Sequence, residues 1–444
     1  MKKIMNYIFI FILLILSFNI GLYISCSFDS KLIEKKIKES YEILNKEGMF
    51  YKVSNLFNIQ SDNSADALIM NECYSVDSSE PYLSYMKVRK SYKKNLTFFE
   101  LPETVGELST IYYVDENYDE SEIYYNTIAE LGDFLNGRYY YFVNYGRYWH
   151  GYLVFFRPLL LIFNILQIRH ILFLSFSILF ITLIYKLYKE FNINISIIFA
   201  LSLICSGYFS ASYLIGNSLI FIIMMISSLF ILAKKNKIKD FGIFIFIIGC
   251  LTSFVDYLNV PLITLGMPCA VYILELLKEK KDWKYCTEFL IKSSFIWVFG
   301  YAFTWISKWI LYDLTINDHY NMISIGFGQV FFRMQRVNEA VGLDVNYISV
   351  ITKILNKSLI YIIISVFILL ILNKFKISVK KINKNSIPFL ILSLYPIIWF
   401  VVLANHTILH AHFVYRHSLL FMLGVLLVVY QLFFVKEVKN EKNC

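Results

Sequence analysis

Polar residues are distributed unevenly along this chain, and their distribution limits what it can fold into. A single apolar segment at 7–26 is followed by a hydrophilic stretch at 27–150, after which apolar spans dominate. Of the 444 residues, 57% are hydrophobic and only 17% are charged, which is too little polar surface to coat a water-soluble domain of this size. The sequence therefore predicts an all-α polytopic membrane protein with a large first loop.

The apolar segments divide the chain into about ten transmembrane helices, since each crossing needs roughly 20 apolar residues. These helices are expected near residues 7–26, 169–187, 193–209, 213–233, 241–255, 260–277, 288–311, 358–373, 387–404 and 417–435. The complete predicted organisation is a first transmembrane helix at 1–26, a loop region at 27–150, an interfacial amphipathic helix at 151–168, transmembrane helices 2–7 at 169–311, a second loop at 312–357, transmembrane helices 8–10 at 358–435 and a tail at 436–444.

Lysines in the short connections predict the orientation, because positive charge is retained on the cytoplasmic side of a membrane. Lys2 and Lys3 precede the first span, and later lysines fall in alternate connections at 186–189, 234–239, 278–284, 374–384 and 436–442. The short turns near Tyr208, Asp256 and Asn405 contain no Lys. Ten spans then place both termini in the cytoplasm and the large loop region on the extracytoplasmic side.

Composition also bears on the source and on the partners. High usage of Ile, Lys, Asn and Tyr is typical of AT-rich bacterial genomes and favours a bacterial plasma membrane. The formal net charge of +9 is a signal of topology, because the basic excess lies in the short connections. No Arg-rich run with interleaved aromatic residues predicts nucleic-acid binding.

The loop region carries two carboxylates, Asp62 and Asp66, four residues apart at the start of an apolar-periodic run. On a helix these positions share a face, where one acid raises the pKa of the other or both hold a cation. Either arrangement suits a general base or metal-assisted chemistry. The alternative is a helix start, in which Asp62 or Asn63 is the N-cap and Asp66 stabilises the positive N-terminal end.

Arg147, His150 and Arg157 lie in an aromatic and then amphipathic run at the end of the loop region. Tyr and Trp side chains favour the headgroup level, so this run is predicted to lie along the outer membrane interface. One interpretation is an aromatic belt with arginines that extend toward water. The other is a lipid-phosphate site, because a planar guanidinium group donates two hydrogen bonds at once.

Two isolated charges lie at or within later spans. Asp256 is predicted at an outer turn, where an acid must be solvated or paired, and Lys308 is predicted within the outer half of the seventh span. We expect Lys308 either to extend toward water or to meet an anion inside the bundle.

Four of the seven histidines fall between His406 and His417, in the last outer turn. His406 and His410 have the i, i+4 spacing of metal ligands, and His412 and Arg416 would share a helix face in the same way. No acidic third ligand is evident for zinc. Neutralisation of phosphate oxygens and hydrogen bonding across the turn are the other interpretations of these residues.

The layout of the chain and four local patterns resemble integral membrane glycosyltransferases of the GT-C superfamily. The layout is a large extracytoplasmic loop directly after the first span, with an Asp near its beginning and a membrane-parallel helix at its end. The patterns are Asp62-Asn63-Ser64-Ala65-Asp66-Ala67, Arg147-Tyr148-Trp149-His150-Gly151, Asp256-Tyr257-Leu258 with Thr264-Leu265-Gly266, and Asn405-His406-Thr407 through His410 to Tyr415-Arg416.

The resemblance implies a sugar donor carried on a polyprenyl phosphate and an envelope glycan or lipid as acceptor. Asp62 or Asp66 would be the general base, and direct displacement would invert the anomeric carbon. The leaving lipid phosphate needs positive partners, for which the candidates are Arg147, His150, Arg157, Lys308, His410 and Arg416. Asp256, His406 and His412 are further site candidates. A divalent cation, Mg²⁺ or Mn²⁺, is an open alternative, since the superfamily includes metal-dependent and metal-independent members.

Two other classes of function fit the same composition. A lipid or glycolipid flippase or transporter also uses buried charge and many spans. Such proteins usually show internal repeats or broken helices in matched positions, and no convincing repeat is found here. A non-catalytic envelope scaffold would use the loop region to bind a partner, and it would tolerate neutral residues at Asp62 and Asp66 together.

Overall fold

The computed structural model describes residues 2–54, 59–93, 127–137, 139–234, 238–318, 320–336, 347–377 and 383–435 of the chain. Within this part of the chain, seven helices are long and apolar enough to cross a membrane. They are α1 (Lys2–Cys26), α7 (Ile165–Glu190), α10 (Ile215–Lys234), α13 (Trp283–Thr315), α15 (Tyr347–Leu372), α16 (Ile387–Val402) and α19 (Ser418–Phe433). The last two reach this length only together with the short turns that lead into them: Lys384–Val402 comprises η2 (Lys384–Ser386) and α16, and Ala411–Phe433 comprises α18 (Ala411–Val414), η3 (Tyr415–His417) and α19.

Three further helices coincide with predicted spans but are shorter. They are α8 (Ile193–Cys205), α11 (Phe241–Val255) and α12 (Ile263–Lys278). At about 1.5 Å per residue they measure roughly 20–24 Å, which is less than the ~30 Å hydrocarbon core of a bilayer. The prediction of a helical, multi-pass membrane protein is confirmed, but among the described residues seven helices, not ten, have the length of a complete crossing.

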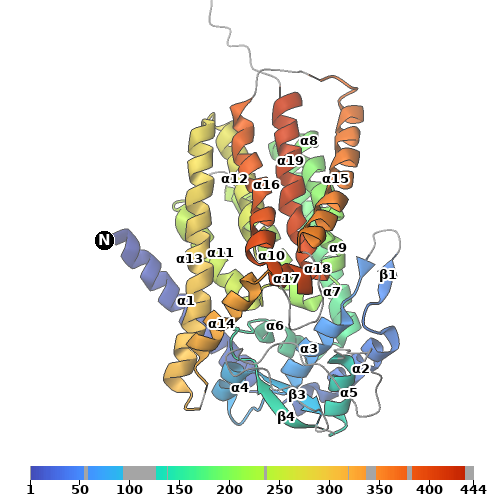
Figure 1. Cartoon of the computed structure of the whole chain (residues 1–444), viewed down its shortest axis with the longest axis vertical. Coiled ribbons are helices and arrows are strands. Elements are labelled where there is room, and N and C mark those ends of the chain that lie inside the picture. The colour runs from blue at the N-terminus through green and yellow to red at the C-terminus, as the bar shows by residue number, and fades with distance from the viewer. Residues whose placement is uncertain are drawn as a thin grey trace, which may run out of the picture.

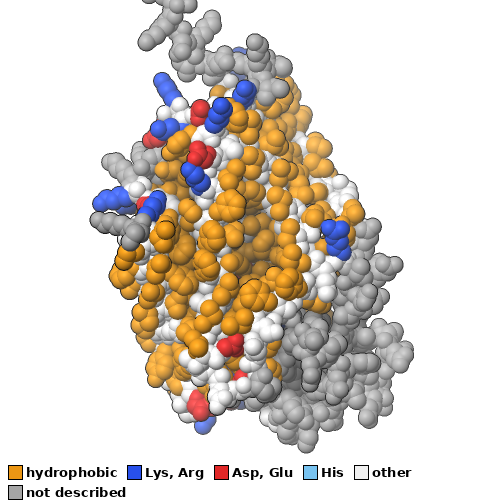
Figure 2. Space-filling model, turned by 60° about the vertical axis from the view of Figure 1, so that its left-hand side comes forward, with side chains coloured by type: hydrophobic (Ala, Val, Ile, Leu, Met, Phe, Trp, Pro, Cys, Tyr) orange, Lys and Arg blue, Asp and Glu red, His pale blue; other side chains and the backbone are white. Residues whose placement is uncertain are grey.

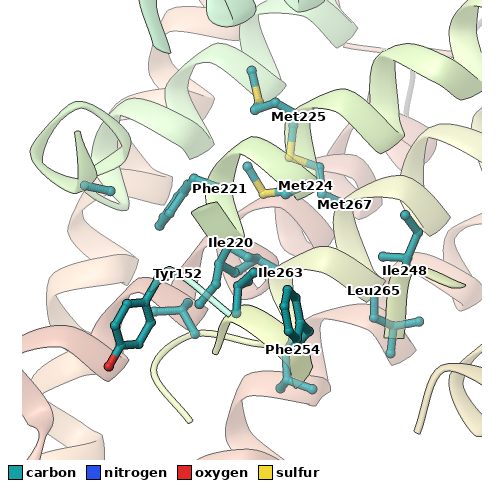
Figure 3. Close-up of a cluster of buried hydrophobic side chains, with 14 of the residues drawn as sticks. Tyr152, Ile220, Phe221, Met224, Met225, Ile248, Phe254, Ile263, Leu265 and Met267 are labelled. Carbon is teal, nitrogen blue, oxygen red and sulfur yellow. The ribbon is translucent and has the colours of Figure 1, made fainter. Parts of the chain in front are cut away.

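The centre of the bundle is an apolar core between α10, α11 and α12 (Figure 3). Its buried side chains are Ile220, Phe221, Met224 and Met225 of α10, Ile248 and Phe254 of α11, and Ile263, Leu265 and Met267 of α12. A helix that is apolar all round is buried among other helices or faces lipid. α10 is of the first kind, because two thirds of its most apolar stretch is buried (67%).

Two glycines let α11 and α13 pack backbone against backbone. A Cβ atom at Gly249 would collide with the carbonyl oxygen of Trp297, and one at Gly300 would collide with that of Phe246. Small residues permit this close approach between membrane helices. The contact positions α13, whose last turns carry Lys308 toward the loop region.

The lysine-rich connections lie together at one end of the bundle. Lys278 at the end of α12 contacts Glu190 at the end of α7, and Asn194 hydrogen-bonds to Asn373 just beyond α15. Figure 2 shows that most Lys and Arg side chains on the face in view lie at the upper end, above a broad apolar belt. The loop region lies at the opposite end (Figure 1). The alternation of charge along the sequence thus corresponds to two ends of the bundle.

The loop region contains four helices and two two-stranded antiparallel sheets among its described residues. The helices are α2 (Lys31–Glu47), α3 (Asn63–Tyr74), α4 (Pro81–Lys87) and α5 (Thr127–Leu135), and the sheets pair β1 (Lys52–Ser54) with β2 (Ile59–Gln60) and β3 (Arg89–Lys93) with β4 (Tyr139–Asn144). The all-α prediction did not include these strands. Their formation has a local cause, because β4 is a run of aromatic and β-branched residues that favour extended backbone.

The predicted interfacial helix at 151–168 is divided in two. α6 (Leu153–Leu160) ends before a break, and α7 begins at Ile165 instead of the predicted residue 169. Asn164 and Gln167 form a capping box, in which each side chain accepts a hydrogen bond from the backbone N–H of the other residue. This local signal fixes the start of α7 and places Arg169 in its second turn.

The described part of the second predicted loop, 312–357, is largely helical. α13 continues to Thr315, α14 (Met322–Met334) follows it, and α15 begins at Tyr347 instead of residue 358. The predicted tail at 436–444 lies outside the described residues.

Arg157 of α6 connects three segments of the chain. Its buried guanidinium group donates hydrogen bonds to the carbonyl oxygens of Ser25 (2.9 Å) and Phe28 (2.7 Å), which lie at the end of α1 and just beyond it. It also donates to the carbonyl oxygen of Cys73 in α3 and to the hydroxyl group of Ser30 (3.2 Å). Arg157 is therefore a cross-link between the first span and the loop region.

The substitution Arg157→Ala should destabilise the protein strongly. It leaves three buried carbonyl groups without this donor, and an unsatisfied buried group costs about 1–3 kcal/mol. We expect the free energy of unfolding to fall by roughly 3–5 kcal/mol, measured by thermal unfolding of the purified protein in detergent. Lys292→Ala, which removes an exposed cation of α13, is the control and should leave the unfolding midpoint almost unchanged. Equal midpoints for the two variants would contradict the cross-link.

Candidate functional site

A cavity of about 220 Å³ lies where the start of α3 meets the connection between α16 and α19. This volume is several times the ~30 Å³ share of one water molecule. We call it the polar pocket. Its lining residues come from four parts of the chain: Phe50, Ser61 and Asp62 of the loop region, Ser210 and Leu214 between α8 and α10, Lys357 of α15, and His412, Phe413, Tyr415 and Arg416 before α19.

Asp62 is both a helix cap and a wall of the polar pocket. Its Oδ1 atom accepts a hydrogen bond from the backbone N–H of Ala65 (3.0 Å), which fixes it as the N-cap of α3. Its Oδ2 atom lies 3.4 Å from Nε2 of His412. The two interpretations of Asp62, cap and site residue, are therefore compatible in one side chain.

Two cations face the same pocket. Arg416 is buried, and its guanidinium group donates to the hydroxyl group of Ser210 (3.1 Å) and to the carbonyl oxygen of His412 (3.3 Å). Lys357 is exposed, and its ammonium group lies 5.6 Å from the centre of the Tyr415 ring. With Asp62 as the one carboxylate among the described lining residues, the pocket has a net positive charge and favours an anion.

A second cavity of about 210 Å³ adjoins the polar pocket. We call it the apolar pocket, because carbon atoms make up most of its walls. It lies between α8, α15 and α19, and it shares Lys357 and Tyr415 with the polar pocket. Its other lining residues are Cys205, Lys353, Ile354, Ser358, Tyr361, Ala411 and Ser418.

Asp66, the second predicted acid, has a different environment. It is fully buried, its Oδ2 atom accepts from Arg169 of α7 (2.8 Å), and its Oδ1 atom accepts from the backbone N–H of Ile215 (3.0 Å). Burial raises the pKa of the Asp66 carboxyl group, and the Arg169 guanidinium group opposes this shift. Both oxygens are occupied, so the structure separates the two acids into a pocket residue and a buried ion pair.

The predicted residues of the 147–150 run lie in a buried network away from both pockets. His150 hydrogen-bonds through Nδ1 to the hydroxyl group of Tyr152 (2.6 Å) and through Nε2 to the carbonyl oxygen of Tyr145 (2.8 Å). The Tyr152 hydroxyl group donates to Glu72. The Arg147 guanidinium group lies over the Tyr145 ring at 4.4 Å. Neither Arg147 nor His150 lines the polar or the apolar pocket.

Other predicted site residues bind backbone or aromatic partners. Lys308 donates to the carbonyl oxygen of Tyr85 (2.7 Å), and Asp256 accepts from Tyr301 (2.9 Å) and from the backbone N–H of Asn259 (2.8 Å). Arg157 is the cross-link described above. These contacts bring the loop region and the α11–α12 turn onto α13, and none of these three predicted residues lines either pocket.

The rings of His406, His410 and His412 form a row that begins in the buried interior and ends at the polar pocket. The ring of His406 hydrogen-bonds to the carbonyl oxygen of Leu258 (2.8 Å), and the His410 ring lies between those of His406 and His412, with centroids 4.7 and 6.1 Å away. Burial, together with His412 and Arg333, lowers the pKa of His410. A neutral His410 adds no positive charge for a phosphate, and of the three only His412 lines the pocket.

The polar pocket does not offer the ligands that a divalent cation needs. Mg²⁺ and Mn²⁺ prefer several oxygen ligands, whereas the pocket has one carboxylate beside two cations. Among the described residues, no group of three or more His, Cys, Asp or Glu side chains is arranged to hold a metal ion. Metal dependence therefore stays a prediction and enters no step of the chemistry below.

Lys357, Ser210 and Tyr415 were not predicted as site residues, although they line the polar pocket. One signal in the sequence could have identified Lys357. Together with Lys353 it places two lysines four residues apart at the start of a span, on the side where the short turns contain no Lys. No family model, no curated protein and no solved structure matches this chain.

The same chemical change at the two acids should affect stability very differently. Asp66→Asn leaves the buried Arg169 with less compensating charge and should lower the free energy of unfolding by about 3–5 kcal/mol. Asp62→Asn should change it by no more than about 0.5 kcal/mol, because Asn is as good an N-cap as Asp. Thermal unfolding of both purified variants measures the difference. A loss of stability in Asp62→Asn as large as that in Asp66→Asn would refute this division of roles.

Proposed function

We propose that this protein is a membrane glycosyltransferase of the GT-C type. It moves a sugar from a polyprenyl-phosphate-linked donor to an envelope glycan or lipid acceptor on the extracytoplasmic side of a bacterial plasma membrane. The observation that carries the proposal is the polar pocket, which Asp62, Lys357 and Arg416 line and which shares Lys357 and Tyr415 with the apolar pocket.

The protein recognises the donor through its phosphate group and through its hydrocarbon chain. Its phosphate group lies next to Lys357 and Arg416, and the first units of its hydrocarbon chain occupy the apolar pocket between α8, α15 and α19. Each pocket, at about 210–220 Å³, is smaller than the roughly 300–1,000 Å³ typical of small-molecule sites. Because Lys357 and Tyr415 belong to both, the two pockets together fit a ligand with a charged head and an apolar chain.

The chemistry needs a base and a positive environment for the leaving group. The acceptor hydroxyl oxygen displaces the lipid phosphate from the anomeric carbon in one step, which inverts that centre. Loss of the acceptor proton depends on Asp62, and the charge that develops on the lipid phosphate is stabilised by Lys357 and Arg416. Asp66 supports the site indirectly, because its ion pair with Arg169 holds the first turn of α3 in place.

The position of the pocket in the bundle supports an extracytoplasmic reaction. The polar pocket is lined by residues at the start of α3 and in α18 and η3. Figure 1 shows α3 and α18 toward the end of the bundle that carries the loop region, away from the opposite end, where the lysine-rich connections lie. Positive charge is retained in the cytoplasm. With both termini cytoplasmic, the pocket opens where lipid-linked sugars on the outer leaflet and envelope acceptors are both accessible.

Glycan analysis tests the proposed activity. A deletion strain should lose one envelope sugar in mass spectrometry, and the wild-type gene should restore it. Asp62→Asn should not restore it, since loss of the general-base catalysis that depends on Asp62 costs roughly 10²–10⁴ in rate, and Lys357→Gln with Arg416→Gln should fail in the same way. Asp282→Asn is the matched control, because Asp282 is also an N-cap but lies at the lysine-rich end.

The outcomes separate the three classes of function. Membrane levels must be equal by immunoblot for all variants. If Asp62→Asn and the double cation variant restore the sugar fully, transferase activity at this pocket is excluded and a scaffold gains support. A deletion strain that accumulates the lipid-linked sugar on the inner leaflet would instead indicate a flippase.

The orientation can be measured independently of activity. Alkaline phosphatase fused after Glu47 should be active, because residue 47 is expected outside the membrane. A green fluorescent protein fused after Phe434 should be fluorescent, because that end is expected in the cytoplasm. The reverse pattern would place the polar pocket on the cytoplasmic side and contradict the proposed donor.

A further inference from the structure

The carboxylate of Asp62 has little freedom to meet a substrate directly. Its Oδ1 atom is bound to the backbone N–H of Ala65, which is the N-cap bond of α3. Its Oδ2 atom faces Nε2 of His412 at 3.4 Å. The side chain of Asp62 is also almost completely buried, with a relative exposure of 11%. Each oxygen therefore has a neighbour within the protein, and most of the group is shielded from the pocket.

His412 has the opposite character. Its side chain is 46% exposed and lines the same pocket. While Nε2 faces Asp62, the other ring nitrogen, Nδ1, has no hydrogen bond to any part of the chain that the structure describes. Three rings pack against the imidazole, those of Phe413 (4.8 Å between centroids), Phe50 (6.1 Å) and His410 (6.1 Å).

We propose that His412 is the group that takes the proton from the acceptor hydroxyl group, and that Asp62 is the residue that orients it. This inference rests on the proposed function and specifies its base. Asp62 holds the neutral imidazole with its proton on Nε2, so that Nδ1 carries the lone pair and faces the pocket. A carboxylate that orients a histidine base in this manner is a recurrent arrangement in enzymes that remove a proton from a hydroxyl group.

The proton and the electrons balance in one displacement. The acceptor oxygen forms a bond to the anomeric carbon while its O–H proton moves to Nδ1 of His412. The bond between the anomeric carbon and the phosphate oxygen breaks, and its electron pair leaves with the lipid phosphate beside Lys357 and Arg416. The imidazolium formed at His412 is stabilised by the Asp62 carboxylate, which keeps its own charge.

The charged and titratable groups around His412 come from each element packed against it. Asp62 at the start of α3 is the one carboxylate among the described residues that line the polar pocket with His412. Lys357 of α15 and Arg416 of η3 are the cations of the same pocket, and the ring of His410, just before α18, lies 6.1 Å from that of His412. The site therefore combines one carboxylate that orients the base with two cations that lie beside the leaving phosphate.

Nuclear magnetic resonance tests the pairing without any activity. Full-length protein in micelles, labelled with ¹⁵N in histidine rings and assigned with His412→Gln, gives the pH midpoint of the His412 ring titration. Asp62→Asn should move that midpoint to lower pH by about one pH unit, since an opposite charge within ~4–6 Å favours the protonated form by at least this amount. Asp282→Asn should not move it. An unchanged midpoint in Asp62→Asn would overturn the pairing.

Transfer kinetics test the catalytic assignment. With purified protein, a synthetic polyprenyl-phosphate sugar and an acceptor, His412→Ala should lose at least about tenfold in kcat, and added imidazole should restore part of the rate because it supplies the missing base. The acidic limb of the wild-type pH profile, where protonation of a histidine base stops the reaction, should disappear in this variant. Wild-type kcat in His412→Ala, or the same pH profile, would overturn the assignment.

The two experiments separate failure of this inference from failure of the proposed function. Transfer by the wild type that depends on Asp62 but not on His412 would overturn only the histidine base and make Asp62 the direct base. A titration midpoint that responds to Asp62→Asn in a protein without transfer activity would overturn the proposed function and, with it, the catalytic role of His412.

Discussion

The buried ion pair between Arg169 and Asp66 is the contact on which the polar pocket depends. Arg169 belongs to a membrane-spanning helix, whereas Asp66 lies in the first turn of α3 in the loop region. The same guanidinium group also contacts Glu47 at the end of α2 and the side chain of Asn63. Because a buried charge is stable only when it is paired and hydrogen-bonded, this arrangement has essentially one geometry. It sets the position of the helix start, and Asp62 is the residue that caps that start.

Positive charges buried at the boundary between loop region and bundle have a common role. Arg157, Arg169 and Lys308 come from three different helices, and each points into the loop region, where backbone carbonyls or carboxylates accept its hydrogen bonds. Lys357, in contrast, is exposed and lines both pockets, and it has no carboxylate partner among the described residues. A charge that holds the loop region on the bundle is therefore buried against protein acceptors, whereas the Lys357 ammonium group remains accessible from a pocket.

The sequence predicted those features of the fold that depend on interactions between residues close together in the chain. The cap at Asp62, the apolar spans and the two sets of connections follow from residue spacing and from the distribution of Lys, and the structure contains them. The partners of Arg157 and Lys308 could not be predicted in this manner, because they are backbone carbonyls more than 80 residues away, and any residue can supply a carbonyl. Lys357 was missed for a related reason, since its relation to Asp62 exists only after α15 and α3 have been brought together.

The glycine contact between α11 and α13 limits how this protein can vary. Gly300 lies one helical turn before Thr304, whose carbonyl oxygen accepts a hydrogen bond from the indole of Trp149. A side chain at Gly300 would push α13 away from α11, and the displacement would reach Trp149 and, four residues further along α13, Lys308. The absence of side chains at Gly249 and Gly300 therefore fixes the spacing between α11 and α13, and through Trp149 and Lys308 this spacing also sets the position of the loop region on the membrane helices.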